Sequence, residues 1–276
     1  MGQIDELWRY DGRRAVVTGC ASGIGAHVVT QLTQLGADVV GLDKQPPGID
    51  IAEFHAFDLT DPASIDRAVA SVGGQVDALF NIAGVSSGIG DPLLVVTINF
   101  LGLRHLTESM WEKMPTGSSI ASVSSLAAAG YREHQQVVAG LLNTATMAEG
   151  IEWCQRHPDV LAGGGYRLSK EAIILYTMRN TVPLGARGIR INCTGPGVTE
   201  TPILDQLRTA YGQQYLDDIP KPLGRVADPA EQAAVLVFLN SQAASYISGQ
   251  VLWVDGGNIG AAVAQELEEG QALWPA

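Results

Sequence analysis

Two residues with complementary proton chemistry, Tyr166 and Lys170, stand four positions apart in a segment with helical spacing. Residues four apart lie on one face of a helix, so the phenol and the ammonium would project side by side. A free tyrosine has a pKa of about 10, and a neighbouring positive charge lowers that pKa toward neutrality. The pair therefore predicts a general acid–base group, although this spacing also arises by chance.

A glycine-rich turn lies between an apolar stretch at 14–18 and a helical pattern at 23–36. Glycines let the backbone turn tightly and approach a pyrophosphate, and the start of the helix offers free N–H groups to the phosphates. The strand–turn–helix context predicts a dinucleotide site. The expected contacts in this turn are Gly19, Ser22, Gly23, Ile24 and Gly25.

The next predicted strand, 38–43, ends in Asp43. Its carboxylate can accept hydrogen bonds from the adenosine ribose hydroxyls and would repel a 2′-phosphate, so the sequence favours NAD over NADP. Lys44 favours NADP instead, because a basic residue there could pair with that phosphate. A strand-end carboxylate that simply faces water is the structural alternative for Asp43.

Short apolar runs alternate with helical patterns along the chain, which indicates a parallel sheet with helices on both faces. Right-handed crossovers between parallel strands give a doubly wound sheet. We therefore expect a Rossmann-like α/β fold in a single domain, 1–276, with a core at about 12–260. The expected strands are 14–18, 38–43, 78–82, 119–123, 189–193 and 250–254.

One interval departs from this alternation, because about 40 residues separate Ser125 from Tyr166 where such sheets need few. Helical spacing at 136–155 predicts a helical insert within about 130–162, before the helix that carries Tyr166. The acidic tail, 265–276, is expected to be a surface extension.

Composition narrows the classes of function. The formal net charge of −12 gives an acidic surface that repels phosphate backbones, which argues against a nucleic-acid partner. No basic stretch precedes an apolar run at the N-terminus, and no apolar run reaches about 18 residues, so we expect neither a secretory signal nor a membrane span. The three cysteines form no Cys-x-x-Cys pair and the five histidines no cluster. We therefore expect reduced thiols, no metal site and a cytoplasmic protein.

Further motifs occur in a fixed order, and together they resemble the short-chain dehydrogenase/reductase family over about 12–260. The resemblance implies transfer of a hydride between a nicotinamide and an alcohol or ketone, with Tyr166 as proton donor and acceptor. The matching motifs are Thr18-Gly-x-x-x-Gly-Ile-Gly25, Asn81-Ile-Ala-Gly84, Asn99, Ser124-Ser125, Tyr166-x-x-x-Lys170, Asn192 with Pro196-Gly197, and Thr201.

The resemblance implies a catalytic set of Asn99, Ser125, Tyr166 and Lys170. Ser125 would hydrogen-bond the substrate oxygen, and we choose it over Ser124 because the family pattern places the second serine of the pair in the site. Lys170 would also hold the nicotinamide ribose, and Asn99 would bind a water that links Lys170 to solvent. A buried asparagine that satisfies backbone groups is the alternative for Asn99, and both roles can hold.

The resemblance also implies cofactor contacts outside the glycine-rich turn. Asp58 would lie near the adenine, Pro196 to Val198 along the nicotinamide, and Thr201 near the carboxamide or the phosphates. A purely structural role competes for Asn81. The expected set is Asp43, Asp58, Leu59, Asn81, Ala83, Gly84, Tyr166, Lys170, Pro196, Gly197, Val198 and Thr201.

The gap of four between tyrosine and lysine argues against the enoyl-reductase branch of the family, and the glycine spacing and length argue against the sugar-epimerase branch. The insert resembles a subgroup of bacterial 3α-hydroxysteroid dehydrogenase/carbonyl reductases and coniferyl-alcohol dehydrogenases, which implies a bulky apolar secondary or allylic alcohol. The alternatives are a reductase of small ketones, a monoterpene alcohol dehydrogenase and a non-catalytic dinucleotide-binding sensor.

Two expectations follow from this resemblance. Family tetramers usually pack near the insert, so we expect a homo-oligomer, either a dimer or a tetramer. The segment 202–223 would form a substrate lid, although amphipathic packing explains each of its apolar residues equally well. These residues are Ile203, Leu204, Leu207, Tyr211 and Tyr215.

Overall fold

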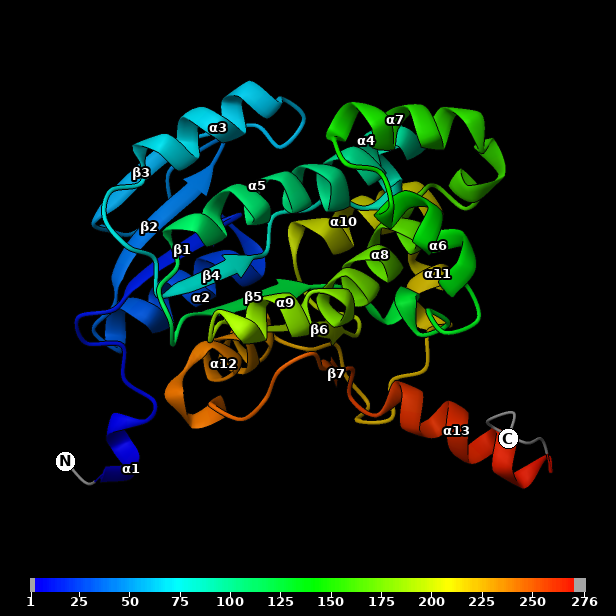
Figure 1. Ribbon diagram of the computed structural model, residues 1–276. Coiled ribbons are helices and arrows are strands. Elements are labelled where there is room, and N and C mark those ends of the chain that lie inside the picture. The colour runs from blue at the N-terminus through cyan, green and yellow to red at the C-terminus, as the bar shows by residue number, and fades with distance from the viewer. Residues whose placement is uncertain (1–2, 271–276) are drawn as a thin grey trace.

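Seven parallel strands form one sheet in the order β3-β2-β1-β4-β5-β6-β7 in the computed structural model, which describes residues 3–270 (Figure 1). The order changes direction between β1 and β4, the kind of switch point at which doubly wound sheets bind ligands. The strands are β1 Arg14–Thr18, β2 Asp38–Asp43, β3 Glu53–Ala56, β4 Ala78–Asn81, β5 Ser119–Val123, β6 Arg190–Pro196 and β7 Val251–Val254.

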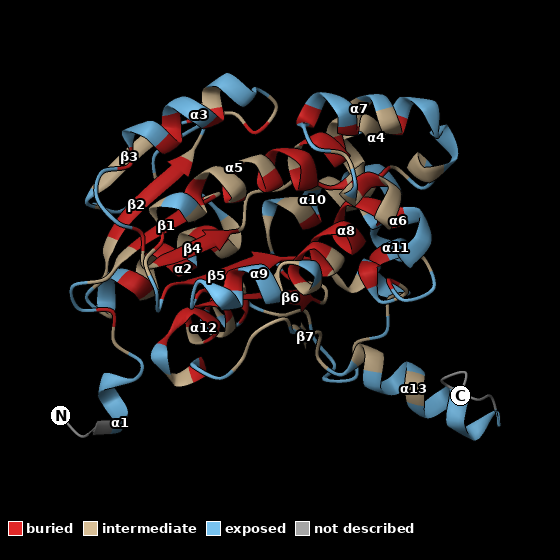
Figure 2. Cartoon of the chain, viewed as in Figure 1, coloured by how far each residue is buried: buried red, intermediate tan, exposed pale blue. Residues whose placement is uncertain are grey.

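Helices cover both faces of the sheet, so the doubly wound α/β fold is confirmed. Leu32 of α2 and Leu236 of α12 belong to the core on one face, and Ile65 of α3, Leu106 of α5 and Ile173 of α8 belong to the core on the other. Burial concentrates on the strands and the inward sides of these helices (Figure 2). These helices are α2 Gly23–Gln34, α3 Pro62–Ser71, α5 Leu103–Met110, α8 Tyr166–Arg179 and α12 Pro229–Asn240.

Further helices and helical turns connect this framework and extend it at both ends. They are α1 Gln3–Glu6, α4 Pro92–Val96, α9 Thr181–Ala186, α10 Pro202–Tyr211, α11 Gln213–Asp217 and α13 Asn258–Glu268, with the π-helix η2 Thr97–Gly102 and the 3-10 turns η1 Ser87–Ile89, η3 Trp111–Lys113, η4 Leu126–Ala128, η5 Pro158–Leu161 and η6 Gln242–Ala244.

Strand β3 is an element that the sequence analysis missed. Its four residues, Glu53–Ala56, carry two polar side chains and none of them is fully buried. An edge strand that is only partly buried needs no apolar run, so its sequence lacked the signal that marks β1 or β4. The strand predicted at 189–193 starts one residue later than expected and runs three residues further, to Pro196.

The insert is helical as predicted, but it forms two helices, α6 Gln135–Leu142 and α7 Met147–Arg156. The break coincides with Thr146, which caps α7 by accepting a hydrogen bond from the Glu149 backbone N–H at 3.1 Å. The buried Arg104 side chain donates to the carbonyl oxygens of Thr144 at 2.7 Å and Thr146 at 3.1 Å. These bonds fix the turn between the two helices to α5.

The C-terminal helix, α13, projects from the body of the molecule and buries none of its side chains (Figure 1). The predicted surface extension at 265–276 therefore agrees with the structure as far as residue 270, and residues 271–276 lie outside the described residues. Within residues 3–270, no helix is long and apolar enough to cross a membrane.

Candidate active site

A cavity of about 650 Å³ opens at the carboxyl ends of the strands, beside the switch point between β1 and β4. All the expected site residues line it except Asn81 and Asn99. One end of the cavity is formed by the glycine-rich turn and the ends of β2 and β4, and the other by α10 and α11. We refer to these as the cofactor end and the substrate end.

The glycine-rich turn is packed so closely that side chains would not fit. A Cβ atom on Gly25 would collide with the Gly19 carbonyl oxygen, and a Cβ on Gly19 would lie 2.9 Å from the Ala83 backbone nitrogen. Ser22, the N-cap residue of α2, makes no side-chain capping bond, so the first-turn N–H groups of the helix face the cavity without that cap. A glycine cradle followed by an uncapped helix start fits the pyrophosphate of a dinucleotide.

Asp43 stabilises this turn as well as lining the cavity. Its carboxylate accepts hydrogen bonds from the backbone N–H of Ala21 at 3.0 Å and of Lys44 at 2.6 Å. The Lys44 ammonium, which we considered as a partner for a 2′-phosphate, instead forms an ion pair with Asp58 at 2.8 Å. Burial opposes the charge on Asp58, but Lys44 and the donors of Thr60 outweigh it and hold the pKa of Asp58 below its usual value.

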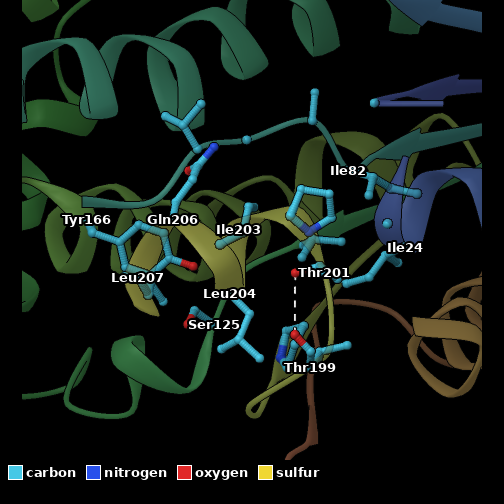
Figure 3. A pocket seen from close by; sticks show the side chains of 18 of the residues that line it. Ile24, Ile82, Ser125, Tyr166, Thr199, Thr201, Ile203, Leu204, Gln206 and Leu207 are labelled. Atoms are coloured by element: carbon cyan, nitrogen blue, oxygen red, sulfur yellow. Dashed lines mark hydrogen bonds between the residues drawn. The ribbon is translucent and has the colours of Figure 1, made fainter. Parts of the chain in front are cut away.

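Tyr166 begins α8 at the junction of the two ends. Three glycines in the left-handed conformation precede it, and a Cβ on the last of them, Gly165, would collide with the Pro92 carbonyl oxygen. The segment that starts α8 can therefore lie directly against the start of α4, which brings the Tyr166 phenol into the cavity next to Ser125 (Figure 3). Ser125 caps η4 by accepting a hydrogen bond from the Ala127 N–H at 3.2 Å.

The pKa of Tyr166 runs against our expectation. We predicted that Lys170 would lower it, but burial raises the pKa of Tyr166 above 10, and the hydrogen bond with Ser125 offsets this only in part. Burial also lowers the pKa of Lys170, to about 8, which leaves the lysine mostly protonated at neutral pH. The burial of the phenol itself, rather than a loss of the lysine charge, therefore sets the direction of the Tyr166 shift.

Lys170 lies where the spacing predicted, with its Nζ 5.6 Å from the centre of the Tyr166 ring. The Nζ donates a hydrogen bond to the Val123 carbonyl oxygen at 2.9 Å. The buried Ser124 hydroxyl donates to the Lys170 carbonyl oxygen at 2.7 Å, so Ser124 serves the backbone of α8. This geometry supports the choice of Ser125 over Ser124 as the serine that faces the substrate.

The two expected residues that do not line the cavity are both buried asparagines with hydrogen bonds to protein groups. Asn99, in the π-helix η2, accepts from the Val85 N–H at 2.8 Å and donates to the Val85 carbonyl oxygen at 2.9 Å and to Ser169 at 3.3 Å. Asn81 donates to the hydroxyls of Thr107 at 2.9 Å and Ser122 at 3.2 Å. Both side chains therefore make the structural contacts that we kept as alternatives: Asn99 holds Val85 in the loop after β4, and Asn81 ties the end of β4 to α5 and β5.

The substrate end is mostly apolar. Four of the five expected lid residues line it, while Tyr211 packs against Tyr215 with ring centres 5.2 Å apart and does not face the cavity. The sequence analysis missed other residues that line this end because a single residue in a loop or a short helix carries no signal of its own. The missed residues are Val85, Ser87, Gln206, Leu216 and Ile219.

No group of three or more histidine, cysteine, aspartate or glutamate side chains that could hold a metal ion occurs among residues 3–270. The three cysteines are free and buried. Burial raises the pKa of Cys20 and Cys193 to about 12 and that of Cys154 to about 11, so these thiols stay protonated near neutral pH.

Comparison with known proteins identifies the family. The chain is 35% identical over 246 residues to a coniferyl-alcohol dehydrogenase of a Pseudomonas strain, with 89% of this chain and 96% of that protein covered. It is 31% identical over 246 residues to a 3-alpha-hydroxysteroid dehydrogenase/carbonyl reductase of Comamonas testosteroni, with 88% and 95% covered. The chain belongs to the short-chain dehydrogenase/reductase family. It is therefore an oxidoreductase by family, and the resemblance seen in its motifs is confirmed.

The solved structures agree with this family. A crystal structure of the 3-alpha-hydroxysteroid dehydrogenase from Pseudomonas sp. B-0831, complexed with NADH, superposes with a TM-score of 0.76 at 32% identity and covers 94% of this chain and 100% of that one. Family models described as Enoyl-(Acyl carrier protein) reductase and NAD dependent epimerase/dehydratase family match residues 159–258 and 15–146. Each model covers less than half of the chain, whereas the two dehydrogenases match nearly all of it.

Proposed function

We propose that this protein is an NAD-dependent alcohol dehydrogenase/carbonyl reductase for a bulky apolar secondary or allylic alcohol of the hydroxysteroid, terpene or cinnamyl type. The observation that carries this proposal is the position of Tyr166 and Ser125 where the cofactor end meets an apolar substrate end. Two full-length relatives with names of this type, a coniferyl-alcohol dehydrogenase and a hydroxysteroid dehydrogenase, support the substrate class.

In this proposal the Ser125 hydroxyl and the Tyr166 phenol hold the substrate oxygen, and Tyr166 exchanges the proton with it. The raised pKa of Tyr166 keeps the phenol protonated at neutral pH, which suits donation to a ketone. When bound, an oxidised nicotinamide supplies a hydride acceptor and a positive charge that favours the phenolate. Lys170, whose Nζ lies 5.6 Å from the centre of the Tyr166 ring, would hold the nicotinamide ribose beside it.

NAD is the proposed cofactor because the cofactor end presents acidic groups to the adenosine ribose. Asp43 lines the cavity, and the nearest cation, Lys44, is already paired with Asp58. A 2′-phosphate would meet the carboxylate of Asp43 without a free positive charge to offset the repulsion.

The test is oxidation of steroid, terpene and cinnamyl alcohols with NAD and NADP in parallel, for the natural protein and Tyr166→Phe. We expect turnover of at least one bulky class and a loss of kcat/KM of roughly 100-fold to 10,000-fold in Tyr166→Phe. Tyr211→Phe is the matched control, because Tyr211 lies on the lid outside the cavity and should leave turnover unchanged. Full turnover by Tyr166→Phe would refute the mechanism.

A further inference from the structure

The side-chain amide of Gln206 is the main polar group that α10 presents to the otherwise apolar substrate end. Hydrogen bonds fix which way this amide is turned. Its Oε1 accepts from the Ser86 hydroxyl at 2.9 Å and lies 3.4 Å from the Ser86 backbone nitrogen. The Ser86 hydroxyl in turn accepts from the Gly88 N–H at 3.1 Å, so its own hydrogen must point to Gln206. Ser86 is fully buried, which makes this chain of bonds a rigid one.

The orientation leaves the Nε2 group of Gln206 with two N–H donors. Among residues 3–270, no hydrogen bond from Nε2 to a protein acceptor is present, and Gln206 lines the cavity. A donor that an apolar substrate covers without supplying an acceptor costs binding free energy, whereas a substrate oxygen in reach of it regains that energy. The amide therefore distinguishes between substrates that are equal in size.

Gln206 is also held in a fixed position relative to the start of α8, the helix that carries Tyr166. A Cβ on Gly88 would lie 2.8 Å from the Gln206 carbonyl oxygen, so η1 and α10 pack backbone to backbone. Ser87 of η1 lies against Gly164, where a Cβ would be 2.7 Å from the serine Cβ, just before the start of α8. Figure 3 shows the side chains of Gln206 and Tyr166 in the same part of the cavity.

We propose that Gln206 is a specificity-determining residue whose Nε2 donates a hydrogen bond to a second oxygen of the substrate, remote from the carbinol. This inference rests on the proposed function and narrows it. Within the bulky apolar alcohols, the preferred substrates carry an additional acceptor oxygen, such as an aryl ether, a phenol or a ring ketone.

The test compares substrates of equal shape: cinnamyl alcohols with either a methoxy or an ethyl group at ring position 3 or 4. The methoxy oxygen accepts a hydrogen bond and the ethyl methylene does not. We expect the natural protein to favour methoxy over ethyl in kcat/KM by about fivefold at one ring position, the ratio that a single net hydrogen bond supplies.

Three variants separate recognition by Nε2 from support of the lid. Gln206→Glu keeps an oxygen that accepts from Ser86 but replaces the donor by an acceptor, so the methoxy preference should vanish at pH 8, where the carboxylate is ionised. Gln206→Leu should lose the preference as well. Ser86→Ala removes the hydroxyl that orients the amide but leaves Nε2 and the Ser86 backbone N–H in place, so the preference should weaken without vanishing.

The outcomes are distinguishable. Equal turnover of the methoxy and ethyl alcohols at both ring positions would overturn the assignment of Gln206, as would a preference that survives in Gln206→Glu. A parallel loss of activity on both substrates in all three variants, with an unchanged ratio, would show that Gln206 only supports the lid. No turnover of any alcohol by the natural protein would overturn the proposed function itself.

Discussion

The two ends of the cavity are built by different means. At the cofactor end, backbone atoms and glycines form the surface, and the contacts are so close that Gly25 could carry no side chain. At the substrate end, side chains of two short helices, α10 and α11, form the surface. The shape of the cofactor end is therefore specified by backbone conformation, and the shape of the substrate end by the identity of individual side chains.

The largest effect is expected where the backbone leaves no room. Gly25→Ala places a methyl group against the Gly19 carbonyl oxygen, so the turn must shift away from its phosphate-binding shape. We expect NADH affinity, measured by fluorescence titration, to fall about 100-fold or more, since several backbone contacts are lost together. Gly185→Ala, at an exposed helical position with open space around it, is the control and should leave affinity unchanged. Normal affinity in Gly25→Ala would show that the turn is not rigid.

Lys170 lies between the two ends, and its burial should make the free energy of unfolding depend on pH. Its folded pKa of about 8 lies below the unfolded value of 10.5, so the unfolded chain binds more protons between these pH values. Stability relative to Lys170→Met should therefore rise with pH, by about 2 kcal/mol between pH 8 and pH 10. Urea unfolding of both proteins at several pH values measures this difference. Both proteins contain the same cysteines, so the contributions of the thiols cancel. Parallel curves for the two proteins would contradict it.

A smaller effect is expected from Asp43, which in the proposed function would act on the cofactor through its charge and also holds the backbone of Ala21. Asp43→Ala should weaken the binding of NAD more than that of NADP. The ratio of kcat/KM for NAD to kcat/KM for NADP should fall about tenfold, because the repulsion of the 2′-phosphate is removed. Asp43→Asn keeps an oxygen for Ala21 and separates the two roles. An unchanged cofactor ratio in both variants would refute the assignment to NAD.

The smallest effect is expected at the substrate end. Leu207→Ala removes apolar surface from the cavity wall and should raise KM for a bulky alcohol by about threefold to tenfold. NADH affinity should stay the same, because Leu207 lies on α10, outside the glycine-rich turn. Equal losses of NADH and alcohol affinity would mean that the two ends are not independent.

The same contrast decides how much could be predicted from the sequence. Gly19, Gly23 and Gly25 appear as glycines because the backbone requires them, and the Tyr166–Lys170 pair appears as a helical spacing. Buried parallel strands such as β1 and β4 appear as short apolar runs. Each of these features leaves a local mark in the chain, so the fold was predicted correctly and most of the proposed site residues do line one cavity.

Features that depend on distant contacts left no such mark. The break between α6 and α7 depends on Arg104 of α5, and the role of Gln206 depends on Ser86, 120 positions earlier. The pKa of Tyr166 was predicted in the wrong direction because the spacing shows that Lys170 is near, but not that both groups are buried. Burial is a property of the packed molecule, and local spacing does not report it.

The shallow anchoring of the lid has an evolutionary consequence. Helices α10 and α11 each place a single residue, Leu204 and Leu216, fully in the interior. Most other positions on these helices can therefore mutate without loss of the sheet or of the glycine-rich turn. A lineage that carries this architecture can drift from one alcohol to another by point substitutions in the lid, while its cofactor chemistry is inherited unchanged.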